Sequence, residues 1–243
     1  MGLLEGKHIL VTGASSGMGR VFCQMIAHEG ATVTLVARNE ERLQQTLASM
    51  EGEGHDYKVC DLTSEEQMKE TVGTLVTLDG VVFCAGVNDY VPVKFVKQEK
   101  IDKIFKTNYF SEILLTQMLL KKKLINKKAS LVYISSISSV LGVPGTLLYA
   151  SSKGALNTAV KVIASELAPQ GVRANAICPG VVRTEMLSGA NLDVELFDKQ
   201  EVEYPLGYGT PEDVGNAVLY HLSDGSRWLT GNIMILDGGY SLK

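Results

Sequence analysis

Mostly apolar runs alternate with helical patterns along nearly the whole chain. The runs lie at about 7–12, 31–37, 55–60, 80–84, 129–135, 173–178 and 232–236, and most have the length and composition of strands buried on both faces. Between them, apolar residues recur at helical spacing. This alternation predicts a doubly wound α/β fold, in which a parallel sheet of seven strands is covered by helices on both faces.

The first predicted strand stops at a glycine-rich turn, Thr12-Gly13-Ala14-Ser15-Ser16-Gly17-Met18-Gly19. A helical pattern follows, and Gly30 closes it before the second strand begins. Glycines let the backbone approach a pyrophosphate, and the free N–H groups of the following helix bind negative charge. A glycine triplet alone would be equally typical of a tight turn, but the strand–turn–helix order favours a nucleotide site.

Tyr149 and Lys153 are four residues apart in a long helical pattern, so their side chains share one face of the helix. A cation roughly 4 Å from a phenol in a partly screened site favours the phenolate by about 4 kcal/mol, or about three pH units. Lys153 would therefore bring proton exchange by Tyr149 towards neutral pH, as a general acid or base requires. The alternative is a half-buried tyrosine beside a solvated lysine.

Composition narrows the function classes. The 243 residues suffice for one large core, no linker divides them, and we expect a single domain over 1–243. The net charge of −4, without a basic block, argues against nucleic acid as a partner. No cationic leader or membrane-spanning run is present, which predicts a cytoplasmic protein without a membrane partner. The four cysteines are Cys23, Cys60, Cys84 and Cys178; their spacing predicts reduced thiols and no metal site.

Together, the Thr12–Gly19 turn, Asn108, Ser136 and the Tyr149–Lys153 pair resemble the short-chain dehydrogenase/reductase family. Further motifs of that family follow in order: Asp61-Leu62, Cys84-Ala85-Gly86, Pro179-Gly180 with Thr184, and Asp237-Gly238-Gly239. The resemblance covers nearly the whole chain, and within the family the greatest likeness is to 3-oxoacyl-acyl-carrier-protein reductases. It implies a Rossmann-type fold and the interconversion of a ketone and a secondary alcohol.

The resemblance also implies the catalytic roles. Ser136 and Tyr149 would hydrogen-bond the carbonyl oxygen, and Tyr149 would give it a proton. Lys153 would favour the phenolate and bind the nicotinamide ribose, while Asn108 would bend its helix and hold a water. Ser135, Ser138 and Ser139 are rivals for the serine role, and the family spacing to the tyrosine selects Ser136.

The cofactor is expected to be NADP(H). At the end of the second strand, where NAD enzymes carry an acidic residue, the chain has Ala37 followed by Arg38, whose guanidinium can clamp a 2′-phosphate. By resemblance, Asp61 would bind the adenine amino group, Leu62 would cover the ring and Thr184 would hold the carboxamide. The remaining implied contacts are Gly13, Ser15, Ser16, Gly17, Met18, Gly19, Cys84, Ala85, Gly86, Tyr149, Lys153, Pro179, Gly180 and Val182.

The chain departs from the family pattern in three places, one of which is a shorter connection at 75–80 that implies a truncated helix. Phe83-Cys84 stands where most members have two asparagines, so the side-chain hydrogen bond that usually fixes the fourth strand is absent or replaced. Lys127 and Lys128 stand where carrier-protein reductases keep a basic contact beside the site, but Gln170 replaces a second arginine. The assignment of acyl carrier protein as a partner depends on these basic positions.

Three functions therefore stay open. The first is reduction of a 3-oxoacyl thioester, possibly carried on acyl carrier protein. The second is dehydrogenation of a sugar, steroid or polyol, and the third is nucleotide sensing without turnover. The resemblance implies a substrate lid at about 184–205. It also implies a homotetramer that pairs the helices at 101–120 and 149–167 across one two-fold axis and the strand at 232–236 across another.

Overall fold

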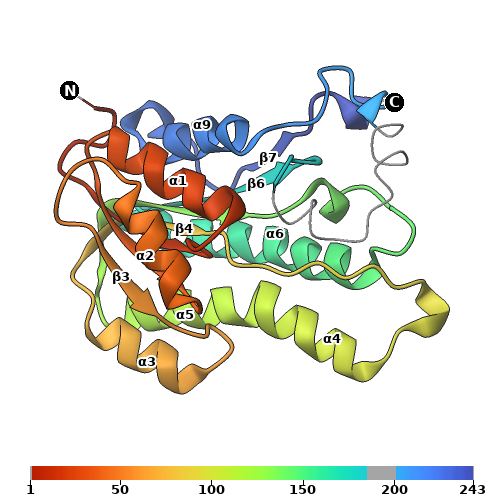
Figure 1. Ribbon diagram of the computed structural model, residues 1–243, viewed down its shortest axis with the longest axis horizontal. Helices are drawn as coiled ribbons and strands as arrows, with labels where there is room; N and C mark the ends of the chain where they lie inside the picture. Colours follow the sequence, from red (N-terminus) through yellow and green to blue (C-terminus); the bar gives the residue numbers. More distant parts are fainter. Residues whose placement is uncertain (1, 185–200, 243) are drawn as a thin grey trace.

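A seven-stranded parallel sheet forms the centre of the computed structural model, which describes residues 2–184 and 201–242 (Figure 1). The strands are β1 (His8–Thr12), β2 (Thr32–Ala37), β3 (Asp56–Val59), β4 (Leu78–Phe83), β5 (Ile125–Ile134), β6 (Arg173–Pro179) and β7 (Ile233–Leu236). Their order is β3-β2-β1-β4-β5-β6-β7, and every neighbouring pair is parallel. The strand order reverses between β1 and β4, which is where ligands bind in such sheets. The predicted fold is confirmed.

Helices cover both faces of this sheet (Figure 1). They are α1 (Gly17–His28), α2 (Glu40–Ala48), α3 (Glu65–Gly73), α4 (Gln98–Phe105), α5 (Ser111–Lys121), α6 (Leu147–Leu167) and α9 (Pro211–Leu222). One layer contains α1, α2 and α9, whereas α3, α5 and α6 form the other, with α4 packed on α6. Within the described ranges, no helix is both long and apolar enough to cross a membrane.

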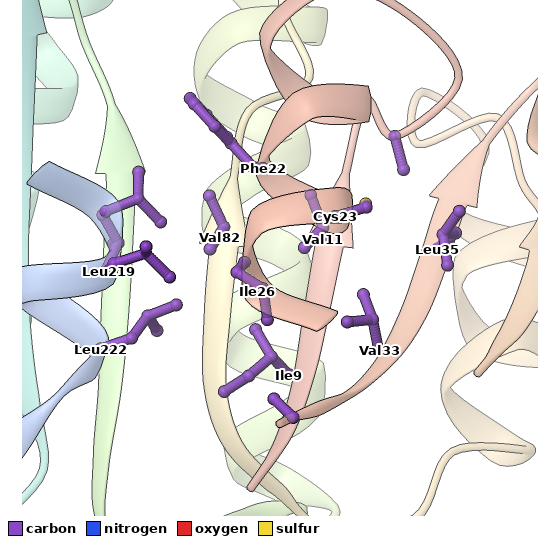
Figure 2. Close-up of a cluster of buried hydrophobic side chains, with 14 of the residues drawn as sticks. Ile9, Val11, Phe22, Cys23, Ile26, Val33, Leu35, Val82, Leu219 and Leu222 are labelled. Atoms are coloured by element: carbon purple, nitrogen blue, oxygen red, sulfur yellow. The ribbon is translucent and has the colours of Figure 1, made fainter. Parts of the chain in front are cut away.

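Each layer has its own apolar core. Figure 2 shows the first core, where Phe22 and Ile26 of α1 and Leu222 of α9 pack on Ile9 and Val82 of the sheet. All of these side chains are essentially inaccessible to water. The second core joins the opposite sheet face to α3, α5 and α6. Burial on both faces explains why the strands are apolar runs rather than alternating patterns.

The helical pattern at 98–121 is not one continuous α-helix. It consists of α4, a π-helical turn at Lys106–Phe110, and α5. A π turn contains an extra residue and rotates the following helix relative to the preceding one. Asn108 lies inside this turn, at the position where the family resemblance implies a bend.

Candidate active site

A cleft of about 540 Å³ lies at the carboxyl edge of the sheet, the edge at which open α/β folds bind their ligands. Its lining comes from the segments that follow β1, β2, β3 and β4, together with Thr107 and Thr184. The predicted contacts among the lining residues are Gly13, Ser15, Ser16, Gly17, Met18, Gly19, Arg38, Asp61, Leu62, Cys84, Ala85, Gly86 and Thr184. The cleft therefore unites most of the cofactor residues expected from the sequence.

The glycine-rich turn forms the floor at the start of α1. Gly13 has φ +68°, and a Cβ there would lie 3.0 Å from the backbone of Ala85. A Cβ at Gly19 would lie 2.3 Å from the carbonyl oxygen of Gly13. Only glycine allows these approaches. Ser16 makes no side-chain capping bond to α1, and the first turn has no acidic residue, so the helix presents its amide groups and its positive dipole end to an anion. This cradle fits a pyrophosphate.

Two guanidinium groups line the cleft beyond the end of β2. Arg38 directly follows the strand, and Arg42 lies in the first turn of α2. The backbone N–H of Arg42 donates to Asn39 Oδ1 at 2.9 Å, which fixes the start of that helix. Sequence reasoning found Arg38 but missed Arg42. The four-residue spacing between the two arginines was the sequence feature that could have revealed Arg42.

Asp61 lies across the cleft, after β3. Its Oδ1 accepts hydrogen bonds from Thr63 N at 2.9 Å and Thr63 Oγ1 at 2.8 Å. Partial burial acts to raise the pKa of this carboxyl, but the Thr63 hydrogen bonds and the positive charges of Arg38 and Lys106 together lower it below its ordinary value. Asp61 is therefore an ionised hydrogen-bond acceptor at neutral pH. Thr63 also lines the cleft and was not expected from the sequence.

Thr12 fixes the segment that leaves β4. Its buried hydroxyl accepts hydrogen bonds from Cys84 N at 3.0 Å and Ala85 N at 3.1 Å. These bonds hold the exit of β4 against the glycine-rich turn. They fix the end of β4 in place of the side-chain hydrogen bond that Phe83-Cys84 does not provide.

Asn108 connects this exit segment to α6. Its Oδ1 accepts from Val87 N at 2.8 Å, and its Nδ2 donates to Val87 O at 2.8 Å and to Ser152 Oγ at 3.3 Å. The side chain is fully buried, and these bonds offset the cost of burying an amide. A Cβ on Gly86 would lie 3.5 Å from Asn108 Oδ1 and 3.8 Å from Lys153 Nζ. Asn108 and Lys153 therefore meet beside a residue that lines the cleft.

Lys153 is almost entirely buried. Its Nζ donates to the carbonyl oxygen of Ile134 at 2.8 Å, at the end of β5. The same nitrogen lies 3.6 Å from Oε1 of Glu112, a buried residue of α5. Sequence reasoning missed Glu112, although a carboxyl in the mainly apolar pattern at 111–121 was a detectable signal.

Ser136 and Tyr149 lie on neighbouring elements. Ser136 follows β5 and caps the short helix η3 (Ile137–Ser139), accepting from Ser138 N at 3.2 Å. The helix η3 packs on α6, whose first turns carry the half-buried Tyr149.

The rival serines differ in their hydrogen bonds. Ser135 donates to Lys153 O at 3.4 Å and Ser139 donates to Ser136 O at 2.6 Å, so both hydroxyl protons are engaged by the backbone. Ser136 accepts its bond and keeps its proton for another partner.

Other predicted contacts lie around the end of β6. Pro179 ends that strand, Gly180 N donates to Leu236 O at 2.9 Å, and Val182 pairs with Gly209. Tyr149, Lys153, Pro179, Gly180 and Val182 are not among the described residues that line the cleft. Of the lid expected at about 184–205, residues 185–200 lie outside the described part of the chain.

Lys127 and Lys128 do not lie beside the site, contrary to the expectation from the sequence. They lie near the start of β5, where the register with β4 shifts and Lys128 has φ +66°. At about 3.3 Å per residue, a strand places its two ends far apart, and the cleft is at the carboxyl ends. The physical reason is that β5 begins before these lysines, so they belong to the opposite edge of the sheet.

The described ranges contain no group of three His, Cys, Asp or Glu side chains placed to hold a metal ion. The cleft itself offers an anion cradle and two guanidinium groups. Asn108 and Lys153 lie beside Gly86 of its lining.

Comparison with known proteins agrees with this arrangement. Residues 13–241 match a family model described as enoyl-(acyl carrier protein) reductase. The chain is 31% identical over 237 residues to a 3-oxoacyl-acyl-carrier-protein reductase of Rickettsia felis, with 97% of each chain covered. It is 34% identical over 254 residues to a cyclopentanol dehydrogenase of a Comamonas species, with 99% of each covered. A short-chain type dehydrogenase/reductase of Mycobacterium ulcerans superposes with a TM-score of 0.90 at 28% identity, covering 99% of this chain and 91% of that one.

The Thr12 anchor leads to a stability prediction. Thr12→Val keeps the shape of the side chain but leaves Cys84 N and Ala85 N without their acceptor, so the free energy of unfolding should fall by about 1–3 kcal/mol. Urea denaturation followed by circular dichroism measures this change. Thr74→Val is the control, because the Thr74 hydroxyl bonds within an exposed helical turn. Equal stability of Thr12→Val and the wild type would contradict the anchoring role.

Proposed function

The chain belongs to the short-chain dehydrogenase/reductase family, and its relatives include a 3-oxoacyl-acyl-carrier-protein reductase and a cyclopentanol dehydrogenase. We propose that it uses NADP(H) to interconvert a ketone and a secondary alcohol. The observation that carries this proposal is the continuity of the cleft. One cavity runs from the two arginines past the glycine-rich turn to Gly86, which lies beside Lys153 and Asn108. A dinucleotide bound along this path would bring its nicotinamide end to the hydroxyl and ammonium groups.

The choice of NADP(H) rests on charge. Arg38 and Arg42 place two cations after β2, and a 2′-phosphate is the anion that such guanidinium groups bind best at this position. Ala37 has no side-chain acceptor for the 2′-hydroxyl of NAD. The α1 cradle would hold the pyrophosphate, and Asp61 would accept a hydrogen bond from the adenine amino group.

When bound, the nicotinamide nucleotide would supply or accept a hydride at the substrate carbon. Ser136 and Tyr149 would donate hydrogen bonds to the carbonyl oxygen, which supports the negative charge that develops there. Tyr149 would then pass its proton to that oxygen, and the reverse reaction would use the phenolate as a base. Lys153 would favour the phenolate through its positive charge and bind the ribose. Asn108 would hold the position of α6 and a water behind the lysine.

The substrate proposal is a 3-oxoacyl thioester. Its support is the similarity to 3-oxoacyl-acyl-carrier-protein reductases from several bacteria, at 29–33% identity. The similarity to a cyclopentanol dehydrogenase favours a second candidate, a secondary alcohol without a carrier. The position of Lys127 and Lys128 at the far edge of the sheet removes one argument for acyl carrier protein as a partner. A nucleotide-sensing protein without turnover is the least favoured candidate, because Asn108, Ser136, Tyr149 and Lys153 are all present.

We also propose a homotetramer, because apolar side chains remain exposed on the expected interfaces. Phe110, Leu114 and Leu147, on or beside α5 and α6, are 50%, 39% and 42% exposed. Ile235 is 46% exposed on β7, which forms one edge of the sheet. A second copy would cover the helical faces and the unpaired strand edge.

Nucleotide preference tests the role of the arginines. NADPH should bind at least about tenfold more tightly than NADH, because charge-assisted hydrogen bonds contribute about 1.5–3 kcal/mol. Arg38→Ala should remove most of that preference, and Arg42→Ala part of it. Fluorescence titration of the free protein measures each affinity. Arg227→Ala, which alters an exposed arginine outside the cleft lining, should leave the preference intact. Equal affinities of the wild type for NADPH and NADH would contradict the assignment of NADP(H) as the cofactor.

Substitution of the proposed proton donor tests the chemistry. Tyr149→Phe should slow ketone reduction by about 10²–10⁴-fold, the usual contribution of general acid catalysis, and should leave NADPH affinity nearly unchanged. The assay follows NADPH oxidation with acetoacetyl thioesters, cyclopentanone, keto sugars and steroids. Tyr220→Phe, at an exposed position, is the control. A Tyr149→Phe variant retaining more than about a tenth of the wild-type rate would assign the proton to another group.

The proposed oligomeric state can be measured directly. Light scattering during gel filtration at micromolar concentration should give a mass close to four subunits, because both sets of exposed apolar side chains would then be covered. Replacing Phe110 by Glu should lower that mass by disrupting the helical interface. A wild-type mass near one subunit, 26.3 kDa, would refute the tetramer.

A further inference from the structure

Glu112 is a buried carboxyl to which the proposed function gives no role. It lies on α5 just after the π-helical turn and is 1% exposed. Neither of its oxygens has a hydrogen-bond partner among the described residues, and Oε1 lies 3.6 Å from Lys153 Nζ. Burying a carboxyl without hydrogen bonds is costly. Stability therefore does not explain a glutamate at this position.

The groups that face Glu112 come from three elements. Lys153 belongs to α6, Cys84 follows β4 and Tyr133 lies on β5. Burial raises the pKa of the Cys84 thiol to about 12, and burial also raises the pKa of the Tyr133 phenol, whose hydroxyl lies 2.9 Å from Thr116 Oγ1. Both groups are neutral in the working pH range. Among these neighbours, the charge that Glu112 faces is the ammonium of Lys153.

Glu112 itself changes charge near that range. Burial raises the pKa of its carboxyl to about 8, although the positive charge of Lys153 acts in the opposite direction. Below this pH the carboxyl is neutral, and Lys153 carries an uncompensated positive charge. Above it, the carboxylate and the ammonium form a pair with no net charge. The two states differ in the electric field that reaches the far side of Lys153.

We propose that Glu112 is a positioning residue that sets the pH range of the reaction, by controlling how much of the Lys153 charge acts on the Tyr149 hydroxyl. This inference rests on the proposed function, in which Tyr149 is the proton donor. Among the described residues, the charged partner of the carboxyl is Lys153 at 3.6 Å, so its effect on Tyr149 is transmitted through the lysine. Glu112 is the second residue of α5, directly after the π turn, and its carboxyl faces Lys153 of α6.

The direction in which Glu112 shifts the pH dependence follows from the charges. An ionised Glu112 cancels part of the Lys153 field that would favour a phenolate, and this favours the neutral phenol that donates the proton. The wild-type enzyme should therefore retain ketone reduction further into the alkaline range than an enzyme whose residue 112 cannot ionise. In the opposite direction, the onset of alcohol oxidation, which needs the phenolate, should lie at a higher pH in the wild type.

Glu112→Gln tests the inference, because glutamine keeps the shape of the side chain but not its charge. We expect the alkaline decline of ketone reduction and the rise of alcohol oxidation both to move to lower pH by about one unit. The rates are measured with NADPH or NADP⁺ from about pH 6 to about pH 10, using whichever of acetoacetyl-CoA and cyclopentanone the wild type reduces, and the corresponding alcohol. NADPH affinity at neutral pH should be unchanged.

Glu99→Gln is the matched control. It makes the same change of charge at an exposed position of α4 and should leave the profile in place. A Glu112→Gln enzyme that binds NADPH normally and has the wild-type profile would overturn the inference alone. A wild type that neither reduces the ketones nor oxidises the alcohols would refute the proposed function, and the inference with it.

A second measurement needs no variant. Infrared difference spectroscopy of the wild-type protein should show the C=O band of a protonated carboxyl at neutral pH, and this band should disappear over the same range as the kinetic change. If Glu112→Gln fails to fold, this titration decides the matter. Absence of a protonated buried carboxyl at neutral pH would overturn the inference.

Discussion

A buried ammonium group determines the arrangement of the catalytic half of the site. Charges are buried in proteins only when neighbouring groups compensate them. For Lys153, the Ile134 carbonyl accepts a hydrogen bond from Nζ, and the Glu112 carboxyl, 3.6 Å away, adds a counter-charge when it is ionised. They belong to the end of β5 and to the helix after the π turn. The lysine therefore has these partners only when the sheet, α5 and α6 are all in place, and this ties the proposed chemistry to the completed fold.

The nucleotide half depends on a different constraint, the polarity of a parallel sheet. Because β1, β2, β3 and β4 are parallel, their carboxyl ends lie at one edge, and the segments following them form one cleft. The amino end of α1 points its dipole at the same cleft. Residues as distant in sequence as Gly17 and Thr184 meet there, since a Cβ on Gly17 would lie 4.0 Å from Thr184 Cβ.

The strands and the glycine-rich turn were predictable because their causes are local: strands buried on both faces are apolar, and the turn requires glycine at a positive φ. Arg42, Thr63 and Glu112 were not predictable in this way. Whether a residue in the first turn of a helix faces the cleft depends on the packing of that helix, and the orientation of Glu112 depends on the preceding π turn. The expectation for Lys127 and Lys128 came from their place in the family pattern, but both lie near the amino end of β5, whereas the cleft lies at the carboxyl ends of the strands.

One short segment connects the two halves of the site. Thr12 in β1 holds Cys84 N and Ala85 N, Gly86 lies against Asn108 and Lys153, and Asn108 bonds both backbone groups of Val87. Residues 84–87 thus contact the strand that enters the glycine-rich turn at one end, and Asn108 and Lys153 at the other. Their backbone is fixed by side chains from β1 and the π turn rather than by a side chain of their own, which explains why cysteine can stand at position 84 without loss of the geometry. In the proposed function, hydride transfer and proton transfer would occur at adjacent atoms of one substrate, and residues 84–87 are the segment that connects the two parts of the site.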